Sequence, residues 1–486
     1  MTKPAVRDYR VGGPEADRAM AAGLVEAEWF RPPIDPERLS ALQIRNNYRA
    51  AIDTIAWLGL LTVFGYLAFL SLGTWWAIAA FAAYGSMYGG AGDSRWHESG
   101  HGTAFRTKWL NDCVHYLASF MLLRQPTLWR WSHVRHHTDT IVVGRDNEIV
   151  LARPASMASV ALVFVPVVIV PKMLFRSATH AFGHIDEQAR SFVPADEFNK
   201  LKWESRALIA ILTGITTWSI ATSSVVPLLY IGLPTIYGAW IMAFFAISQH
   251  VGLQEDVLDH RLNTRTIYMN PVLRFFYSNM NYHLEHHIFP TVPYYALPAL
   301  HEEVKEYLAP PVPNTLVAYR EIFANLRRQR KDPSFDAPRN HLPNTTSTAR
   351  SPVDTGHTLW ASKCYDGLFD LCAASALTPG SARQIHVEDH LYALFRLKDG
   401  SLVCSDGLCT HGHAYLAEGV LLDCLVECPK HNGRFDLRTG QALRKPATKP
   451  LTIYPTEIRN GRVVSNLKPT NTPLPQKTTP PRKGNH

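Results

Sequence analysis

The chain has 486 residues, a formal net charge of +8 and a sequence pI of about 9.0, which is long enough for two or three domains with separate cores. Its seven cysteines are too few and too unevenly spaced for a disulfide-rich secreted fold. The first residues, 1–17, are polar and charged without an apolar segment, which argues against a cleaved secretory signal.

Two long apolar segments dominate the first half of the chain. No Asp, Glu, Lys or Arg occurs from Thr54 to Gly92 or from Ala207 to Gln254, and each segment is long enough for two membrane spans of about 20 residues. We expect a turn near Gly73 in the first segment and another within residues 223–234 in the second. A third apolar run, residues 155–171, is shorter and contains two prolines, so we place it at the membrane interface or as a re-entrant segment. The sequence therefore predicts an α-helical membrane domain with about four spans.

Basic residues are concentrated in the two loops that follow the first and third apolar runs. Loops of this kind face the cytoplasm in membrane proteins, so we expect a multi-pass protein of the inner (cytoplasmic) membrane. Anionic lipid at that face accounts for the positive charge of the chain without nucleic acid as a partner. The residues are Arg95, Arg106, Lys108, Arg124, Arg130, Arg135, Arg145 and Arg153 in one loop, and Arg176, Arg190, Lys200, Lys202 and Arg206 in the other.

Three histidine motifs accompany these segments. Imidazole is a neutral nitrogen ligand for Fe, Zn or Cu, and residues three or four positions apart lie on one face of a helix, where their side chains can converge on a metal. The first motif is HxxxH and the other two are HxxHH. Their histidines are His97 and His101, then His133, His136 and His137, then His283, His286 and His287.

The first motif also fits the HExxH pattern of zinc proteases, in which two histidines bind zinc and the glutamate, here Glu98, activates water. This alternative, an intramembrane protease, leaves both HxxHH motifs without a role. It also gives no task to the cysteine and histidine cluster described below. A non-catalytic, histidine-rich metal carrier is a further alternative.

The C-terminal third has a different texture. Residues 314–331 repeat apolar residues at helical spacing and predict an amphipathic surface helix, and residues 332–356 have the composition of a flexible linker. Short β-branched and aromatic runs then alternate with turn signals at Asp399-Gly400, Thr439-Gly440 and Asn460-Gly461. We therefore expect a multidomain chain, with an N-terminal cytoplasmic segment 1–40, a membrane domain 41–331, the linker, a small all-β domain 357–468 and a disordered tail 469–486.

A cluster of cysteine and histidine lies within this β-domain. Cys409-Thr410-His411 and Cys428-Pro429-Lys430-His431 are separated by sixteen residues, and each follows a predicted strand. Each loop supplies one thiolate and one imidazole, whereas zinc modules pair Cys with Cys and His with His. Two thiolates and two imidazoles form the ligand set of a Rieske [2Fe-2S] centre. Cys404 and Cys424 flank the cluster without a second motif, and we expect them to be core thiols.

Residues 409–440 closely resemble bacterial Rieske ferredoxins, and the likeness covers about residues 357–468. The resemblance implies that Cys409 and Cys428 bind the inner iron of a [2Fe-2S] cluster, and that His411 and His431 bind the exposed iron. Respiratory Rieske proteins carry an extra disulfide, but Ala414 stands where its cysteine is expected. This departure favours the ferredoxin branch and a soluble electron-transfer role.

The three histidine motifs together resemble membrane fatty acid desaturases and the related alkane hydroxylases, over roughly residues 40–325. The likeness is strongest from Asn281 to His287 and continues to His301. It implies a diiron centre at the cytoplasmic membrane face. Members of this superfamily also take a histidine from the end of the last span, which here is His250. The implied ligands are His97, His101, His133, His136, His137, His250, His283, His286 and His287.

Other polar residues near these motifs have lesser expected roles. Five of them could accept hydrogen bonds from ligand imidazoles, namely Asp139, Asp146, Asn147, Asn281 and Glu285. Five histidines lack a matching motif, and we expect them to be solvated or hydrogen-bonded side chains without metal, namely His115, His180, His184, His260 and His301.

The two resemblances imply an O₂-dependent membrane diiron oxygenase, a hydroxylase or oxidative demethylase, that takes electrons from its own Rieske domain. A nitrogen-rich diiron site can reduce O₂ to an oxidant that breaks an unactivated C–H bond, and each turnover needs two external electrons. No GxGxxG follows a predicted strand, so we expect a separate NAD(P)H-dependent ferredoxin reductase as partner. The expected substrate is an acyl chain or a small organic molecule. The likeness of the third motif to acyl desaturases keeps fatty acyl desaturation as the alternative.

Overall fold

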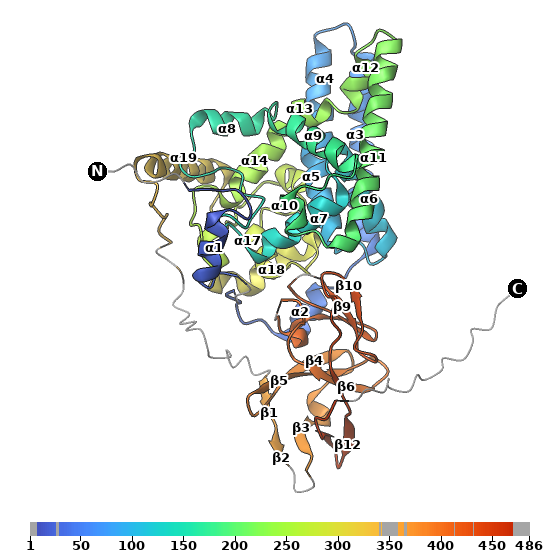
Figure 1. The fold of residues 1–486 in the computed structure, drawn as a ribbon, viewed down its shortest axis with the longest axis vertical. Coiled ribbons are helices and arrows are strands. Elements are labelled where there is room, and N and C mark those ends of the chain that lie inside the picture. The colour runs from blue at the N-terminus through green and yellow to red at the C-terminus, as the bar shows by residue number, and fades with distance from the viewer. Residues whose placement is uncertain are drawn as a thin grey trace, which may run out of the picture. The chain divides into compact units, whose positions relative to one another are not determined.

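The computed structural model describes residues 7–25, 29–339, 342, 358–363, 367–412, 414–430 and 432–469. The chain divides into two compact units, Met1–Pro32 with Ala41–Ser347 and Pro33–Ser40 with Thr348–His486. The first unit is helical and the second is built mainly of β-strands (Figure 1), as the sequence predicts. Most of the expected linker and tail, residues 340–341, 343–356 and 470–486, lies outside the described residues.

The first apolar segment forms a helical hairpin. Helix α3 (Asn47–Leu70) begins at Asn46, whose side chain accepts hydrogen bonds from the backbone N–H groups of Tyr48 and Arg49. The predicted turn is present, with Gly73 at a φ of +79°. Helix α4 (Trp76–Gly85) then continues through a π-helical segment, η1 (Ser86–Ala91), into α5 (Gly92–His101).

The second apolar segment forms one long helix and an interrupted return. Helix α11 (Phe198–Ala221) ends within the predicted break, and the chain returns through α12 (Val226–Tyr230), α13 (Pro234–Tyr237) and α14 (Ala239–His250). Pro227 and Pro234 stand in the first turns of α12 and α13. Proline is tolerated there but lacks the N–H that a continuous helix needs, which explains why the return is broken.

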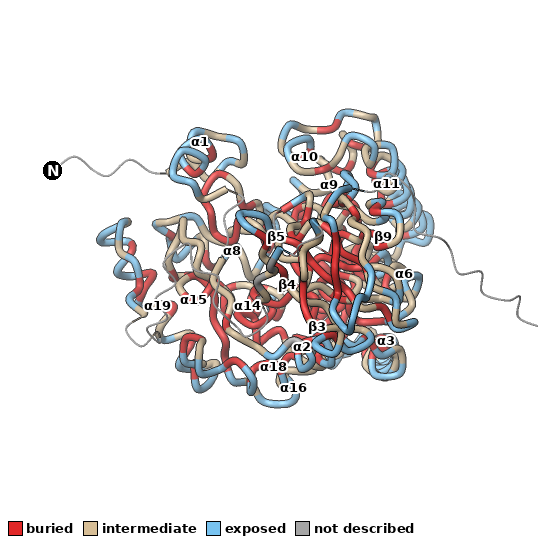
Figure 2. Tube along the Cα trace, turned by 90° about the horizontal axis from the view of Figure 1, so that it is seen from below, coloured by how far each residue is buried: buried red, intermediate tan, exposed pale blue. Residues whose placement is uncertain are grey.

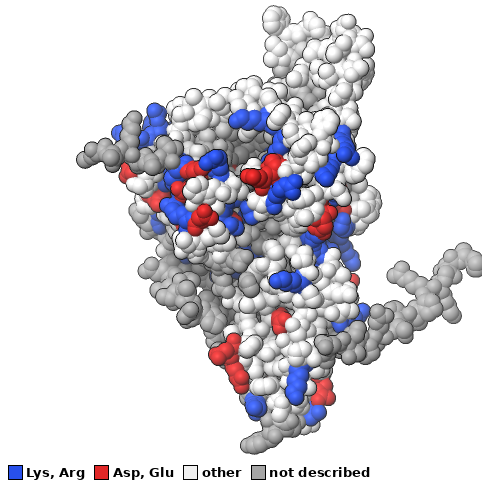
Figure 3. Space-filling view, in the orientation of Figure 1, with Lys and Arg blue, Asp and Glu red and all other residues white. Residues whose placement is uncertain are grey.

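These helices present apolar side chains to the outside. Ile55 and Phe69 on α3 and Trp218 and Ile220 on α11 are all more than half exposed, and the tube view shows the outer part of α11 as exposed (Figure 2). On the face drawn in Figure 3, the end of the unit formed by these helices carries no Lys, Arg, Asp or Glu. An exposed apolar surface of this extent is typical of contact with lipid or another protein.

Among the described residues, α3 is the one single helix long and apolar enough to cross a membrane. Helices α8 (Met157–Phe164) and α9 (Ile169–Ala181) pass the same test only as a pair, bent by 63°. Pro166 lies in the break between them. The bend agrees with a broken span or a re-entrant segment, and the expectation of about four spans stays a prediction.

Shorter helices complete this unit and carry the histidine motifs. Helix α19 follows the amphipathic pattern predicted for residues 314–331. The helices are α1 (Pro14–Ala21), α2 (Pro36–Leu42), α6 (Lys108–Met121), α7 (Pro126–Thr138), α10 (Glu187–Arg190), α15 (His260–Asn263), α16 (Pro271–Phe276), α17 (His283–Ile288), α18 (Leu297–Val304) and α19 (Thr315–Lys331).

The second unit contains three small sheets. The first has the order β1 (Thr358–Trp360), β4 (Ser381–Val387), β5 (His390–Arg396), β6 (Leu402–Asp406) and β11 (Ile453–Tyr454); the second β10 (Ala442–Arg444), β9 (Arg434–Asp436), β8 (Leu425–Glu427) and β7 (Val420–Leu422); the third β12 (Glu457–Arg459), β13 (Arg462–Ser465), β3 (Phe369–Ala373) and β2 (Ser362–Lys363).

Predicted turn residues join consecutive strands of these sheets. Gly400, Gly440 and Gly461 have φ values of +83°, +74° and +74°, and they lie between β5 and β6, β9 and β10, and β12 and β13. Glycine adopts this left-handed conformation without the steric cost that other residues meet. The glycines at these positions therefore fix where each hairpin turns.

Helix α14 crosses η1 at unusually close range in the helical unit. A Cβ atom added at Gly238 would lie 2.1 Å from the carbonyl oxygen of Gly85, and one added at Gly90 would lie 1.9 Å from Cγ2 of Ile241. The absence of side chains at these glycines lets the two backbones touch. The crossing connects α14, which ends at His250, to the helix that continues into the first histidine motif.

We expect Gly238→Ala to lower the thermal unfolding midpoint of the purified protein, because a methyl group forced against backbone costs about 1–3 kcal/mol. Gly214→Ala in α11 is the matched control, since no atom lies within 4 Å of the added Cβ and alanine favours a helix. Equal midpoints for the two variants in a thermal scan would contradict the crossing described here.

Candidate metal and cluster sites

Buried histidines of the helical unit form two adjacent sets. The first set contains His97, His101, His133, His137 and His286, and the second contains His136, His250, His283 and His287. Within each set, the ligand-capable nitrogen atoms all lie within 4.8 Å of one another. The structure thus brings together every histidine that the sequence proposes for the diiron centre.

Helical geometry explains how the motifs divide between the sets. Residues four apart lie on the same helix face, and the i, i+4 pair of each motif stays in one set. The remaining histidine of each HxxHH motif enters the other set: His136 of α7 joins the pair from α17, and His286 of α17 joins the pair from α7. This exchange holds the two sets side by side, and the rings of His137 and His287 stack at 4.4 Å.

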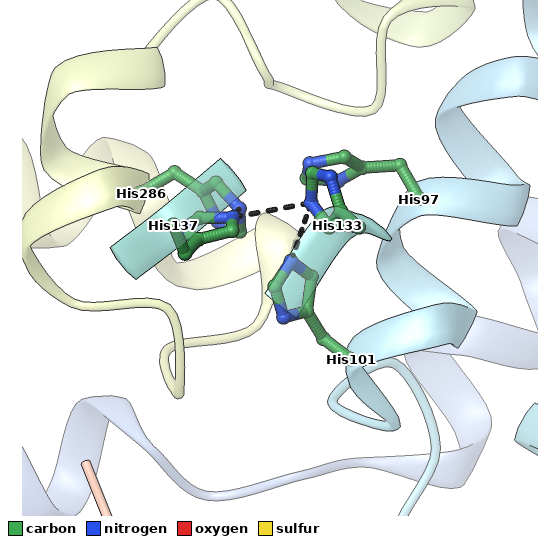
Figure 4. A group of neighbouring side chains, drawn as sticks. All are labelled: His97, His101, His133, His137 and His286. Carbon is green, nitrogen blue, oxygen red and sulfur yellow. Dashed lines mark hydrogen bonds between the residues drawn. The ribbon is translucent and has the colours of Figure 1, made fainter. Parts of the chain in front are cut away.

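The ring nitrogens face each other at ligand spacing. In the first set, Nε2 of His133 lies 3.1 Å from Nε2 of both His101 and His137 (Figure 4), and in the second, Nε2 of His283 lies 3.1 Å from Nε2 of both His250 and His287. Nitrogens bound to one metal at about 2.1 Å stand about 3 Å apart. Hydrogen bonds between neutral rings cannot satisfy all these atoms, because each ring has one proton to donate.

Several ring nitrogens have no other partner in the described part of the chain. Both nitrogens of His97 are buried without a hydrogen bond there, as is Nδ1 of His286. A buried polar atom without a partner costs free energy, and a metal ion removes that cost. The residues present therefore fit two nitrogen-ligated metal ions.

Carboxylates behind two imidazoles orient them toward the sets. Nδ1 of His133 lies 3.0 Å from Glu148, and Nδ1 of His136 lies 2.8 Å from Asp146. A carboxylate at this position fixes the proton on Nδ1, so the other nitrogen faces the metal with its lone pair. Each set thus has one imidazole supported by a carboxylate.

Neutral oxygen atoms support two further imidazoles of the second set. Nδ1 of His250 donates to the backbone carbonyl of Asn263 at 2.9 Å, and the hydroxyl of Thr140 lies 3.2 Å from Nδ1 of His287. Both partners leave Nε2 free to face the set. Sequence reasoning could not find a carbonyl partner, since any residue can supply one.

The electrostatics of the sets keep the imidazoles neutral. Burial, with the neighbouring imidazoles, lowers the pKa of His97, His133 and His286 well below its usual value. Burial also opposes the charged form of His136, but Asp146 outweighs it and raises that pKa. Burial raises the pKa of Glu148 to about 7. Neutral imidazole is the form that binds metal.

The expected supporting residues behave differently from one another. Of the residues proposed from sequence, Asp146 contacts a ligand imidazole. Asp139 instead binds Arg145, and Glu285 binds the non-ligand His301 at 2.5 Å. Glu148 was missed, although its place in the loop after the second motif, two residues beyond Asp146, was a usable signal.

Histidines outside the motifs make other contacts, as expected. His115 lies between the backbone carbonyls of Trp96 and Pro126, and His180 binds Asp186 at 2.7 Å. Neither belongs to a histidine set.

The geometry does not support the zinc-protease alternative. Oε1 of Glu98 accepts hydrogen bonds from the Thr103 hydroxyl and from the backbone N–H of Tyr294. His97 and His101 share their set with three further imidazoles, whereas HExxH proteases bind one zinc through that motif.

The cysteine and histidine cluster lies at loops of the second unit. Cys409 follows β6, Cys428 follows β8 directly, and both are 1 % exposed within a core that includes Phe435. The contact with the Cys428 thiol lowers the pKa of Cys409 to about 7, so one thiol of the pair is easily ionised. His411 is exposed, and His431 lies outside the described residues.

Comparison with known families accounts for both units. The family described as fatty acid desaturase matches residues 73–315, half of the chain. The chain belongs to the fatty acid desaturase family. A second family, described as the Rieske [2Fe-2S] domain, matches residues 367–455. The desaturase domain and the Rieske domain identify the protein as an oxidoreductase with a diiron centre and a [2Fe-2S] cluster.

Known relatives match about a fifth of this desaturase-family chain. The ferredoxin component of the naphthalene 1,2-dioxygenase system of Pseudomonas putida is 40% identical over 95 residues, which cover 20% of this chain and 90% of the relative. The 3-phenylpropionate/cinnamic acid dioxygenase ferredoxin subunit of Photorhabdus laumondii is 42% identical over 94 residues, 19% of this chain and 88% of the relative. A solved ferredoxin of Sphingomonas yanoikuyae B1 is 34% identical and covers 20% of this chain and 94% of its own, with a TM-score of 0.19.

We expect Asp146→Asn to lower iron occupancy of the histidine sets, because loss of a carboxylate behind a ligand imidazole costs about 10–100-fold in metal affinity. Asp139→Asn is the matched control, since this carboxylate of the same loop binds Arg145 and no imidazole. Iron per chain after dialysis against a graded chelator series measures the effect. The same iron content in both variants would remove Asp146 from the site.

Proposed function

We propose that the protein is an O₂-dependent membrane diiron oxygenase, a hydroxylase or oxidative demethylase, whose own Rieske domain supplies the electrons. The observation that carries the proposal is the convergence of nine buried imidazoles into two adjacent sets, in the same chain as a Rieske domain. An oxygenase needs both parts, because each turnover consumes electrons that the substrate does not provide.

The histidine sets are the proposed iron ligands, and the surrounding residues prepare them. With iron bound, the site supplies O₂ chemistry in which substrate R–H, O₂, two electrons and two protons give R–OH and water. Glu148 and Asp146 hold protons on Nδ1 of His133 and His136. Burial of all the ligand side chains excludes bulk water, which protects a reactive site from side reactions.

The proposed ligands of the Rieske cluster are Cys409, His411, Cys428 and His431. A tether of some twenty-five residues, 332–356, gives donor and acceptor an effective concentration on the order of millimolar, so the domains need no affinity for each other. A separate NAD(P)H-dependent reductase is the proposed source of electrons. Similarity to ferredoxin components of dioxygenase systems supports that partner.

Fatty acyl desaturation is the second candidate, and the family match favours it directly. Hydroxylation or demethylation ranks first because His250 stands in a Ser248-Gln-His250-Val-Gly252 context that is closer to hydroxylases. The products separate the two. Mass spectrometry under ¹⁸O₂ finds the label in the product of an oxygenase and only in water for a desaturase.

The proposed setting is a membrane with the histidine sets on its cytoplasmic side. We place about four spans within residues 54–92 and 207–254, a membrane domain at 41–331 and the Rieske domain at 357–468. The apolar exposed faces of α3 and α11 support this arrangement.

Reciprocal variants test whether the two parts cooperate. His286→Ala should lower iron in the histidine sets and abolish product while the visible absorbance of the Rieske cluster persists. Cys428→Ser should lose the cluster absorbance, keep the histidine-bound iron and reduce NAD(P)H-driven turnover sharply. Chemical reduction followed by O₂ should restore a single turnover in the cysteine variant alone.

Cys424→Ser is the control for the cysteine variant, because this thiol is half-buried and belongs to neither motif. It should keep the cluster absorbance and full turnover. A normal steady-state rate in Cys428→Ser would show that the Rieske domain is not the electron donor.

Topology is tested by labelling single cysteines from either side of intact cells and inverted vesicles. Lys108→Cys, Lys200→Cys and Lys305→Cys should react from the cytoplasmic side, because their loops are predicted to lie there. Trp75→Cys, at the turn between α3 and α4 and 88% exposed, should react from the opposite side. Labelling is counted against the unsubstituted chain, and reaction of Lys200→Cys from outside would mean that residues 155–171 cross the membrane.

A further inference from the structure

A pocket lies beside the second histidine set. It contains about 440 Å³ of empty space, including its open mouth, and His250 forms part of its lining. Glu148, which supports His133, lines it too. The volume falls within the range of small-molecule sites. A molecule in this pocket would lie against an imidazole of the metal site.

The walls of the pocket are mainly apolar. They come from the loop after α7, from the chain that follows α14, and from α19, and most of their side chains are aliphatic. One uncharged polar side chain, that of Gln329, also lines the pocket. The aliphatic lining residues are Ile141, Ile149, Val150, Leu151, Ala152, Ala155, Val251, Leu253 and Leu326.

The cationic residue of the lining is already neutralised by the protein. Arg153 donates to the backbone carbonyl of Leu253 at 2.6 Å and to Asp336 at 2.9 Å, and its Nε lies 3.6 Å from Glu255. A substrate carboxylate or phosphate would have to displace these partners. The guanidinium therefore gives an anionic ligand no free partner.

The acidic residues of the lining are occupied as well. Glu255 accepts hydrogen bonds from Tyr9 at 2.8 Å and from Arg7 at 3.1 Å. Glu148 binds Ser132 and His133, both at 3.0 Å. A cationic ligand would meet no unpaired carboxylate here, and an uncompensated buried charge costs several kcal/mol.

We propose that this pocket binds the substrate of the metal site, and that the substrate is an uncharged, mainly apolar molecule carrying at most a hydroxyl or carbonyl group. The inference rests on the proposed function, because it assigns the pocket to the same oxygenase site. Apolar walls favour a hydrocarbon body, and Gln329 offers a partner to a neutral polar group. Free carboxylates, phosphates and ammonium compounds are disfavoured.

The surroundings of the pocket suit entry from a lipid phase. Ala155 lies two residues before α8, and α8 packs against α14. Met157 and Val165, at the two ends of α8, are each about half exposed. An uncharged apolar molecule concentrates in a bilayer, so an apolar helix beside the pocket shortens its path.

Binding is tested with the full chain in lipid nanodiscs, by ¹⁹F NMR line broadening of matched probes. The probes are 4-(trifluoromethyl)cyclohexylmethanol and the corresponding carboxylate and methylammonium. We expect the alcohol to bind at least tenfold more tightly than either charged probe. Equal or tighter binding of a charged probe would overturn the inference.

Substitutions within one helix locate the binding. Leu326 is buried in α19 and lines the pocket, so Leu326→Trp should weaken binding of the alcohol at least tenfold. Leu316→Trp, at an exposed position of α19, should leave it unchanged. Leu326→Ala enlarges the pocket and should raise the affinity for a bulkier bicyclic alcohol relative to the cyclohexyl probe. Unchanged binding in both Leu326 variants would show that the pocket is not the site.

Failure of this inference is distinguishable from failure of the proposed function. Binding does not depend on O₂ chemistry, whereas the proposed function does. If the chemically reduced protein consumes no O₂, the oxygenase assignment is wrong whatever the probes do. If it consumes O₂ but binds the charged probes best, the oxygenase stands and the substrate class proposed here is wrong.

Discussion

Buried imidazole nitrogens that point at one another impose the constraint on which the helical unit depends. Neutral rings spaced at 3.1 Å cannot all be satisfied by sharing protons, and an unsatisfied buried polar atom costs about 1–3 kcal/mol. A cation in each set satisfies all the facing lone pairs at once. The helices that supply these rings therefore owe part of their stability as an assembly to metal, and metal binding is coupled to folding.

Contacts at some distance from the rings serve the same constraint. Asp146 and Glu148 each fix one imidazole, and the crossing of Gly85 and Gly238 brings the helix of His250 against the helix that leads to His97. Cys409 and Cys428 follow a different logic, because they stand at the ends of strands packed on one small core. In that unit the β-fold itself holds the ligand loops.

Sequence reasoning reached the motifs because ligand chemistry and helical spacing are local. The same holds for the turn at Gly73 and for the glycine-containing hairpin turns, where one residue decides the conformation. The division of each HxxHH motif between two sets was out of reach, since it depends on how α7 and α17 approach each other. Glu148 and the pocket beside His250 were missed for that reason too. The broken return before α14 could have been foreseen from Pro227 and Pro234, which local rules mark as helix starts.

The π-helical segment η1 has a consequence for how this sequence tolerates insertions and deletions. A π-helix accommodates a residue more than an α-helix over the same rise, and each residue of an α-helix turns the chain by about 100°. Removing one residue from Ser86–Ala91 would give a more regular helix from α4 to α5. The same deletion would swing His97 and His101 away from their partners in the first set. The irregular segment therefore sets the rotational phase of the first motif, and length changes there are far less tolerable than in the turn at Gly73.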